Sequence, residues 1–229
     1  MKNYLIIGAS SGIGAALAHL LKAEGNNVTA TYNSQPVEME DIHFHHLDVM
    51  NDSVSLDFIP EQLDGLVYCP GAIKLLPFKR IRSEELLSDF QLQVSGAVKV
   101  IQAALPALQK SGGSIVLFST VAVQQGYNFH AQVAMSKGAI EGLTRALAAE
   151  LAPTIRVNAI APSLTDTPLA EKLLNSPEKI DANAQRHPLK RIGQPEDLAQ
   201  MAAFLLSEKA SWITGQIMHV DGGMSHLKT

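Results

Sequence analysis

A glycine-rich loop near the start of the chain places the strongest constraint on the fold. The loop Gly8-Ala9-Ser10-Ser11-Gly12-Ile13-Gly14 lies between an apolar strand-like run, Tyr4–Ile7, and an amphipathic segment, Ile13–Ala23. Glycines at such a turn allow the backbone to bend sharply and to approach a ligand closely. The start of the helix then presents free N–H groups and a positive dipole end to a pyrophosphate. The segment therefore predicts a dinucleotide-binding strand–loop–helix unit.

The rest of the chain alternates strand-like runs with longer helical patterns, which predicts βαβ units and a parallel sheet. The segment Leu164–Gln194 contains Pro168, Pro177 and Pro188 and breaks this alternation, so we expect an excursion that covers the sheet. No linker or repeat divides residues 1–229, and we predict a single α/β Rossmann domain, doubly wound around seven parallel strands. The further strands are expected at Val28–Tyr32, Ile42–His46, Gly65–Cys69, Ser114–Phe118, Ile155–Ile160 and Ile217–Val220, and long helices at Ser83–Gln109, Asn128–Leu151 and Pro195–Ser207.

Charge and composition argue against several classes of function. The net charge is −4 and no stretch concentrates Lys and Arg, so we expect no nucleic-acid partner. A single cysteine, Cys69, suits a reducing compartment. No run approaches the ~20 apolar residues of a membrane helix, and the chain enters its first strand without a signal segment, so we predict a cytoplasmic protein with no membrane contact. His43, His45 and His46 lack carboxylate or cysteine partners, and we predict no metal site.

The GxxxGxG spacing of the loop and several later motifs resemble the short-chain dehydrogenase/reductase family along nearly the whole chain. Asp48 resembles the adenine-contacting aspartate of that family. The run Leu66-Val67-Tyr68-Cys69-Pro70-Gly71 occupies the place of its Asn-Asn-Ala-Gly turn and keeps only the glycine. The run from Asn158 to Ser163 resembles its Asn-x-x-x-Pro-Gly element, and Val220-Asp221-Gly222-Gly223 matches its C-terminal signature. The resemblance implies the strand order 3-2-1-4-5-6-7, a nicotinamide cofactor at the carboxyl ends of the strands, and a homotetramer.

The end of the second strand bears on which nicotinamide cofactor binds. An acidic residue there would hold the ribose 2′-hydroxyl and repel a 2′-phosphate, but this chain has Tyr32-Asn33-Ser34. Because these side chains are neutral, we expect NADP(H) to be favoured over NAD(H). The residues expected to hold the cofactor are Gly8, Ser10, Ser11, Gly12, Ile13, Gly14, Asn33, Ser34, Asp48, Val49, Cys69, Pro70, Gly71, Lys137, Pro162, Thr165 and Thr167.

The catalytic positions depart from the family pattern. The family pairs a tyrosine and a lysine as Tyr-x-x-x-Lys, in which the lysine lowers the pKa of the phenol that exchanges a proton with the substrate oxygen. Here Lys137 is kept, but Val133 takes the place of the tyrosine. The family's catalytic serine corresponds to Thr120, which keeps a hydroxyl, and its asparagine corresponds to Gln93, which keeps an amide.

The source of the proton therefore stays open among three alternatives. His130 precedes Lys137 by seven residues, which would place both on roughly one helix face, although a solvent-facing histidine at the start of the helix is favoured. Tyr127 is a weaker candidate, and water is the third. The chain is thus expected to be an NAD(P)(H)-dependent oxidoreductase of a small carbonyl or alcohol compound with an altered site. The alternative is a catalytically silent dinucleotide-binding sensor or scaffold.

Overall fold

The computed structural model describes residues 1–51 and 55–228 of the chain. Within these residues, seven strands form one parallel sheet in the order β3-β2-β1-β4-β5-β6-β7. This confirms the predicted fold class and strand order, and no strand end differs from the prediction by more than two residues. The strands are β1 (Asn3–Ile7), β2 (Asn27–Tyr32), β3 (His43–His46), β4 (Gly65–Tyr68), β5 (Ser114–Phe118), β6 (Arg156–Pro162) and β7 (Ile217–Val220).

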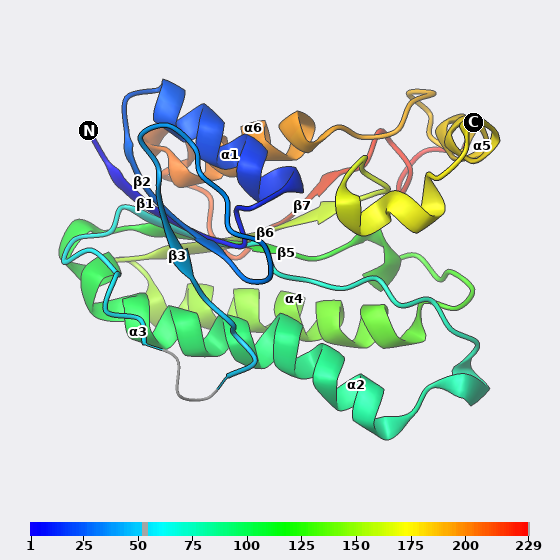
Figure 1. Ribbon diagram of the computed structural model, residues 1–229, viewed down its shortest axis with the longest axis horizontal. Coiled ribbons are helices and arrows are strands. Elements are labelled where there is room, and N and C mark those ends of the chain that lie inside the picture. The colour runs from blue at the N-terminus through cyan, green and yellow to red at the C-terminus, as the bar shows by residue number, and fades with distance from the viewer. Residues whose placement is uncertain (52–54, 229) are drawn as a thin grey trace.

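Helices cover both faces of this sheet (Figure 1). On one face lie α1 (Gly12–Ala23) and α6 (Pro195–Leu206), and on the other lie α3 (Gly96–Ser111) and α4 (Ala131–Leu151), with α2 (Ser83–Phe90) preceding α3. None of the helices in the described part of the chain is long and apolar enough to cross a bilayer.

Successive side chains of the central strands enter two separate apolar cores. Leu5 and Leu66 belong to the core under α3 and α4, whereas their neighbours Ile6 and Val67 belong to the core under α1 and α6. All four side chains are fully buried. The sheet is thus buried on both faces, which is the reason these strands read as continuous apolar runs.

The predicted helix Ser83–Gln109 is interrupted by a π-helical turn, Gln91–Ser95 (η2), between α2 and α3. The Tyr68 hydroxyl at the end of β4 donates to the carbonyl of Leu92 inside this turn at 2.6 Å. The hydroxyl also lies where a side chain on Gly96 would begin, because a Cβ built there would be 2.4 Å from it. The hydrophobic pattern predicts the helix but not the turn, because a phenol from a distant strand contacts the helix there.

The second long helix also differs from the prediction. It begins at Ala131 rather than Asn128, because Phe129 has a φ of 69° and therefore breaks the helical path. His130 is consequently the residue that precedes the first turn of α4 rather than a member of it.

The excursion after β6 contains a 3₁₀ helix, η4 (Pro168–Leu173), and a short helix, α5 (Pro177–Gln185). Its two ends meet, because Thr165 and Gly193 form a β-bridge. It also contacts the glycine loop, since a Cβ built on Gly12 would be 3.2 Å from the methyl carbon of Thr167. In Figure 1 this segment (yellow) stands at the end of the sheet where α1 begins.

Candidate active site

A cavity of about 540 Å³ opens where β1, β4, β5 and β6 end. It runs from the glycine loop to the start of α4 and is roofed by the excursion. Many of the residues expected from the sequence line it: Gly8, Ser11, Gly12, Ile13, Gly14, Cys69, Pro70, Gly71, Gln93, Thr120, His130, Val133, Lys137, Pro162, Thr165 and Thr167. Ser10, Asn33, Ser34, Asp48 and Val49 do not line it; the last four follow β2 and β3, beyond the glycine loop.

The glycine loop is held by β2 and leaves the start of α1 open. The Gly8 N–H donates to the Thr31 hydroxyl at 3.0 Å, and the Ala9 N–H donates to the Thr31 carbonyl at 2.8 Å. Ser11 precedes α1 but its side chain does not cap the helix, so the first N–H groups have no side-chain partner. A Cβ built on Gly14 would be 2.4 Å from the Gly8 carbonyl oxygen. This backbone cradle fits a pyrophosphate.

Two neighbouring hydroxyls at the end of β5 are used differently. Ser119 donates to the buried carboxylate of Glu141 at 2.8 Å, so its hydroxyl hydrogen is not available to a ligand in the cavity. Thr120 accepts from the Ala122 N–H at 3.3 Å, which leaves its own hydroxyl hydrogen free to point into the cavity. Of these two hydroxyls, that of Thr120 can donate to a bound oxygen.

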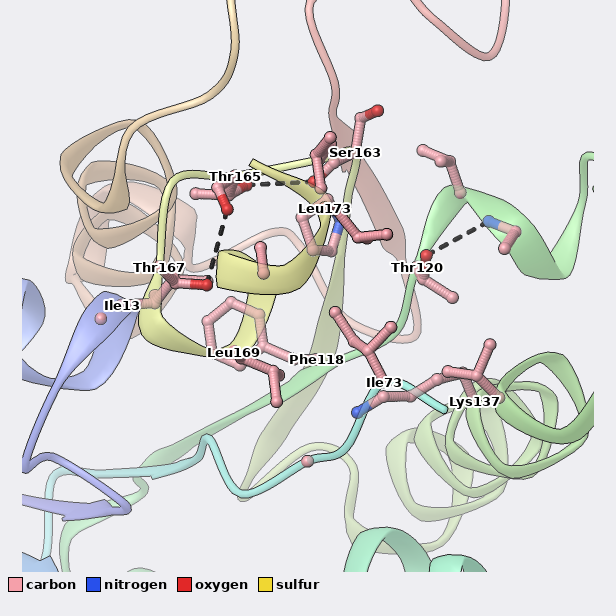
Figure 2. A pocket seen from close by; sticks show the side chains of 18 of the residues that line it. Ile13, Ile73, Phe118, Thr120, Lys137, Ser163, Thr165, Thr167, Leu169 and Leu173 are labelled. Atoms are coloured by element: carbon pink, nitrogen blue, oxygen red, sulfur yellow. Dashed lines mark hydrogen bonds between the residues drawn. The ribbon is translucent and has the colours of Figure 1, made fainter. Parts of the chain in front are cut away.

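Val133 and Lys137 enter the cavity one helical turn apart on α4. Figure 2 shows Lys137 and Ile73 on one side of the cavity, across from Thr165, Thr167 and Leu169. Burial lowers the pKa of Lys137 to about 8, and the negative charge of Asp89 partly opposes this shift. A lysine in this state exchanges a proton near neutral pH.

Cys69 lies next to this lysine and stays a thiol. Burial raises the pKa of Cys69 to about 12, against a smaller opposing effect from Lys137. The thiolate form, which would act as a nucleophile, is therefore absent at neutral pH.

Behind Lys137 lies a polar cluster that the sequence analysis did not identify as a unit. The buried carboxylate of Asp89 on α2 accepts from the Gln93 side-chain amide at 2.8 Å and from the Ser136 hydroxyl at 2.5 Å. Asp89 precedes Gln93 by four residues, and Ser136 directly precedes Lys137. Helical spacing alone could have paired Asp89 with Gln93, but nothing in the sequence indicated that the pair would be buried beside α4.

His130 also lines the cavity, and its ring is held by the loop that precedes α4. Its Nδ1 is 2.8 Å from the Asn128 carbonyl, and because a carbonyl only accepts, Nδ1 carries the hydrogen. The ring of Tyr127 lies 5.4 Å from that of His130, and the Arg186 guanidinium lies 5.9 Å from the centre of the Tyr127 ring. A shared helix face of His130 and Lys137 was one alternative from the sequence, but in the structure His130 stands before the helix begins.

A serine–histidine contact joins the excursion to β6. The Ser163 hydroxyl and the buried His187 ring meet at 2.8 Å, and Nδ1 of His187 bonds the Asn183 carbonyl. Nδ1 therefore carries the hydrogen and Nε2 accepts from Ser163. The sequence analysis missed His187 because it lies far along the chain from Ser163.

The histidines of β3 do not gather around a common point. His45 stacks on Phe58 with ring centres 4.6 Å apart, whereas His46 lies against Tyr32 at 5.6 Å. Across residues 1–51 and 55–228, no three His, Cys, Asp or Glu side chains form a group that could hold a metal ion.

Comparisons with known proteins agree with this architecture. A family profile described as Enoyl-(Acyl carrier protein) reductase matches residues 8–225. The 3-oxoacyl-[acyl-carrier-protein] reductase FabG of Thermotoga maritima is 34% identical over 97% of this chain and 97% of its own length. Among solved structures, a short chain dehydrogenase family protein from Francisella tularensis has a TM-score of 0.88 at 28% identity, covering 99% of this chain and 100% of the other. The protein ElxO, solved with NADP bound, has a TM-score of 0.86 at 27% identity, covering 98% of this chain and 99% of the other.

Proposed function

Because the chain belongs to the short-chain dehydrogenase/reductase family, we propose that it is an NADP(H)-dependent oxidoreductase of a small carbonyl or alcohol compound. The observation that carries this proposal is the single cavity lined at one end by the glycine loop and at the other by Thr120 and Lys137. A cofactor and a substrate that must exchange a hydride can meet in such a cavity. The related reductases favour this function over the catalytically silent alternative.

The residues of the cavity fit a nicotinamide cofactor. The open start of α1 would hold the pyrophosphate, because Gly14 and Gly12 keep side chains out of the cradle. Lys137 would hold the nicotinamide ribose, as its counterpart in the family does. When bound, the nicotinamide supplies or accepts the hydride.

Thr120 would act on the substrate itself. The free hydroxyl hydrogen of Thr120 would bond the substrate oxygen and stabilise the negative charge that develops there during reduction. Val133 brings no acid to this position, so the site is altered relative to the family pattern. The substrate must therefore obtain its proton from another group of the chain or from water.

We expect NADP(H) to bind more tightly than NAD(H). Tyr32, Asn33 and Ser34 carry no negative charge, and both Asn33 and Ser34 are exposed at the end of β2. ElxO, which has the same fold, binds NADP. Calorimetry with both reduced cofactors tests this expectation, and tighter binding of NADH would contradict it.

Turnover is tested by following NADPH oxidation by the purified protein with a panel of aldehydes, ketones and quinones. Turnover above that of a Lys137→Met control would support the proposal. Binding of NADPH without turnover of any compound, in either direction, would favour the silent alternative.

We also propose that the enzyme is a cytoplasmic homotetramer, as the family resemblance implies. Leu87, Phe90 and Met135 are exposed apolar side chains on α2 and α4, and we propose that these helices form one of the interfaces. Light scattering at micromolar concentration should give a tetramer mass, and a monomer mass would contradict the proposal.

A further inference from the structure

The missing tyrosine leaves one buried cation next to the reacting centre. Lys137 lines the cavity one turn after Val133, and no residue among those described forms an ion pair with it. The groups that face it are Cys69 after β4, Gln93 in η2 and, behind Gln93, Asp89 on α2. His130 and Arg186 stand at the mouth of the cavity instead.

Gln93 has an unsatisfied oxygen on the Lys137 side. Its amide nitrogen must face Asp89, because a carboxylate only accepts, and this assigns the other end of the amide as Oε1. Oε1 is fully buried and has no hydrogen-bond partner. A Cβ built on Gly71 would be 3.4 Å from Oε1 and 3.5 Å from the Lys137 Nζ, so both atoms border one small space. An unpartnered buried acceptor is costly, and an ammonium hydrogen or a water molecule there would satisfy it.

Resting on the proposed oxidoreductase function, we propose that Lys137 supplies the substrate's proton in place of the absent tyrosine, and that Asp89, through Gln93, is its positioning residue. The Asp89 carboxylate orients the Gln93 amide so that its oxygen faces Lys137. Its negative charge also favours the ammonium form, which is the form that can donate. Ser136 holds the same carboxylate from the helix that carries Lys137.

The step balances without any further reactant. In reduction, the substrate's carbonyl carbon gains the hydride and the π electrons of the C=O bond move to the oxygen. That oxygen takes one proton from the Lys137 ammonium, directly or across one water molecule beside Val133, and becomes a hydroxyl. Lys137 is left as a neutral amine and regains a proton from solvent. With a pKa of about 8, Lys137 can both donate a proton to the substrate oxygen and regain one from solvent near neutral pH.

The test is a direct titration of Lys137 together with a pH–rate profile. Full-length protein labelled with ¹³C at the lysine ε-carbon is titrated by NMR, and the Lys137 signal is assigned by its absence from Lys137→Met. We expect a pKa near 8, and in Asp89→Asn a pKa about one unit lower, because an opposite charge has been removed at nearly constant shape. The rate of carbonyl reduction should fall as pH rises through the same value in each protein, since the donor is then lost.

Glu85→Gln is the matched control. Glu85 lies one turn before Asp89 on α2 but pairs at the surface with Lys74 and Arg82, so its removal should move neither the Lys137 titration nor the pH–rate profile. The proposal would be overturned if the Lys137 pKa does not change in Asp89→Asn. It would also be overturned if the pH at which the rate falls does not follow the Lys137 pKa. If Asp89→Asn does not fold, the wild-type protein provides the test. Its Lys137 pKa measured by NMR must equal the pKa at which its reduction rate falls at alkaline pH. If the Lys137 pKa falls in Asp89→Asn but the protein oxidises no NADPH with any substrate, the oxidoreductase function is rejected instead.

Discussion

Backbone atoms form one end of the cavity, and side chains form the other. At the cofactor end, backbone N–H groups and glycines form the surface, and the contacts to Thr31 hold it in place. At the catalytic end, side chains from η2, α4 and the end of β5 form it, and Asp89 and Ser136 are buried behind this surface. A backbone cradle depends on the absence of side chains and keeps the family's glycine pattern. A side-chain site depends on the identity of each residue, so the proposed change from tyrosine to Val133 would alter its chemistry.

The largest expected effect comes from adding a methyl group to the backbone cradle. In Gly14→Ala the new Cβ would meet the Gly8 carbonyl oxygen at 2.4 Å, so the loop must move. We expect NADPH affinity to fall about 100-fold, which is about 2.8 kcal/mol, because the backbone N–H groups that would hold the pyrophosphate are displaced. Calorimetry measures the affinity and a melting curve measures the stability.

Gly142→Ala is the control for this change. Gly142 lies inside α4 with nothing within 4 Å of its added Cβ, so the variant should bind NADPH normally and melt at the same or a higher temperature. Equal NADPH affinity in Gly14→Ala and wild type would mean that the cofactor does not use the cradle.

The second prediction restores the family's side-chain arrangement. Val133→Tyr places a phenol one turn before Lys137, facing a cavity of about 540 Å³. We expect carbonyl reduction on at least one generic substrate to rise about tenfold or more, within the range that general acid catalysis supplies. A fall in stability of about 1–3 kcal/mol without a gain in activity would show that the phenol overpacks the site.

The third prediction concerns cofactor choice and returns to the cofactor end. Asn33→Asp adds a negative charge where the 2′-phosphate of NADP(H) is expected. NADPH affinity should fall about tenfold, which is about 1.4 kcal/mol, while NADH affinity should be kept. Asn33→Ala separates the loss of the amide from the gain of charge. A similar loss of both cofactors in Asn33→Asp would argue against a role in 2′-phosphate recognition.

The smallest effect is expected at the mouth of the cavity. The His130 ring bonds the Asn128 carbonyl, and the residue stands before α4 begins. His130→Ala should therefore change the rate of carbonyl reduction by less than about twofold. A loss of most of the activity, of the size that removal of a general acid produces, would identify His130 as the proton donor instead of Lys137.

Much of the cavity was accessible from the sequence, because its members belong to local motifs. The glycine loop, Pro162, Thr165 and Thr167 follow strands directly, and parallel strands bring their carboxyl ends together. The residues that were missed depend on contacts between distant segments. Asp89 gains its role from burial against α4, and His187 gains its partner from the return of the excursion to β6.

The sequence by itself determined the α/β class, because periodicity and turn chemistry are local properties of the chain. The resemblance of its motifs to the family implied the strand order, and it also gave the expectation that Val133 stands at the tyrosine position. Only the tertiary structure decided that η2 interrupts the long helix at the Tyr68 hydroxyl, that α4 begins after His130, and that Asp89 and Gln93 stand behind Lys137. The physical reason is that burial and charge depend on which segments meet in space. A carboxylate near a buried ammonium has no signature in the chain until the fold brings them together.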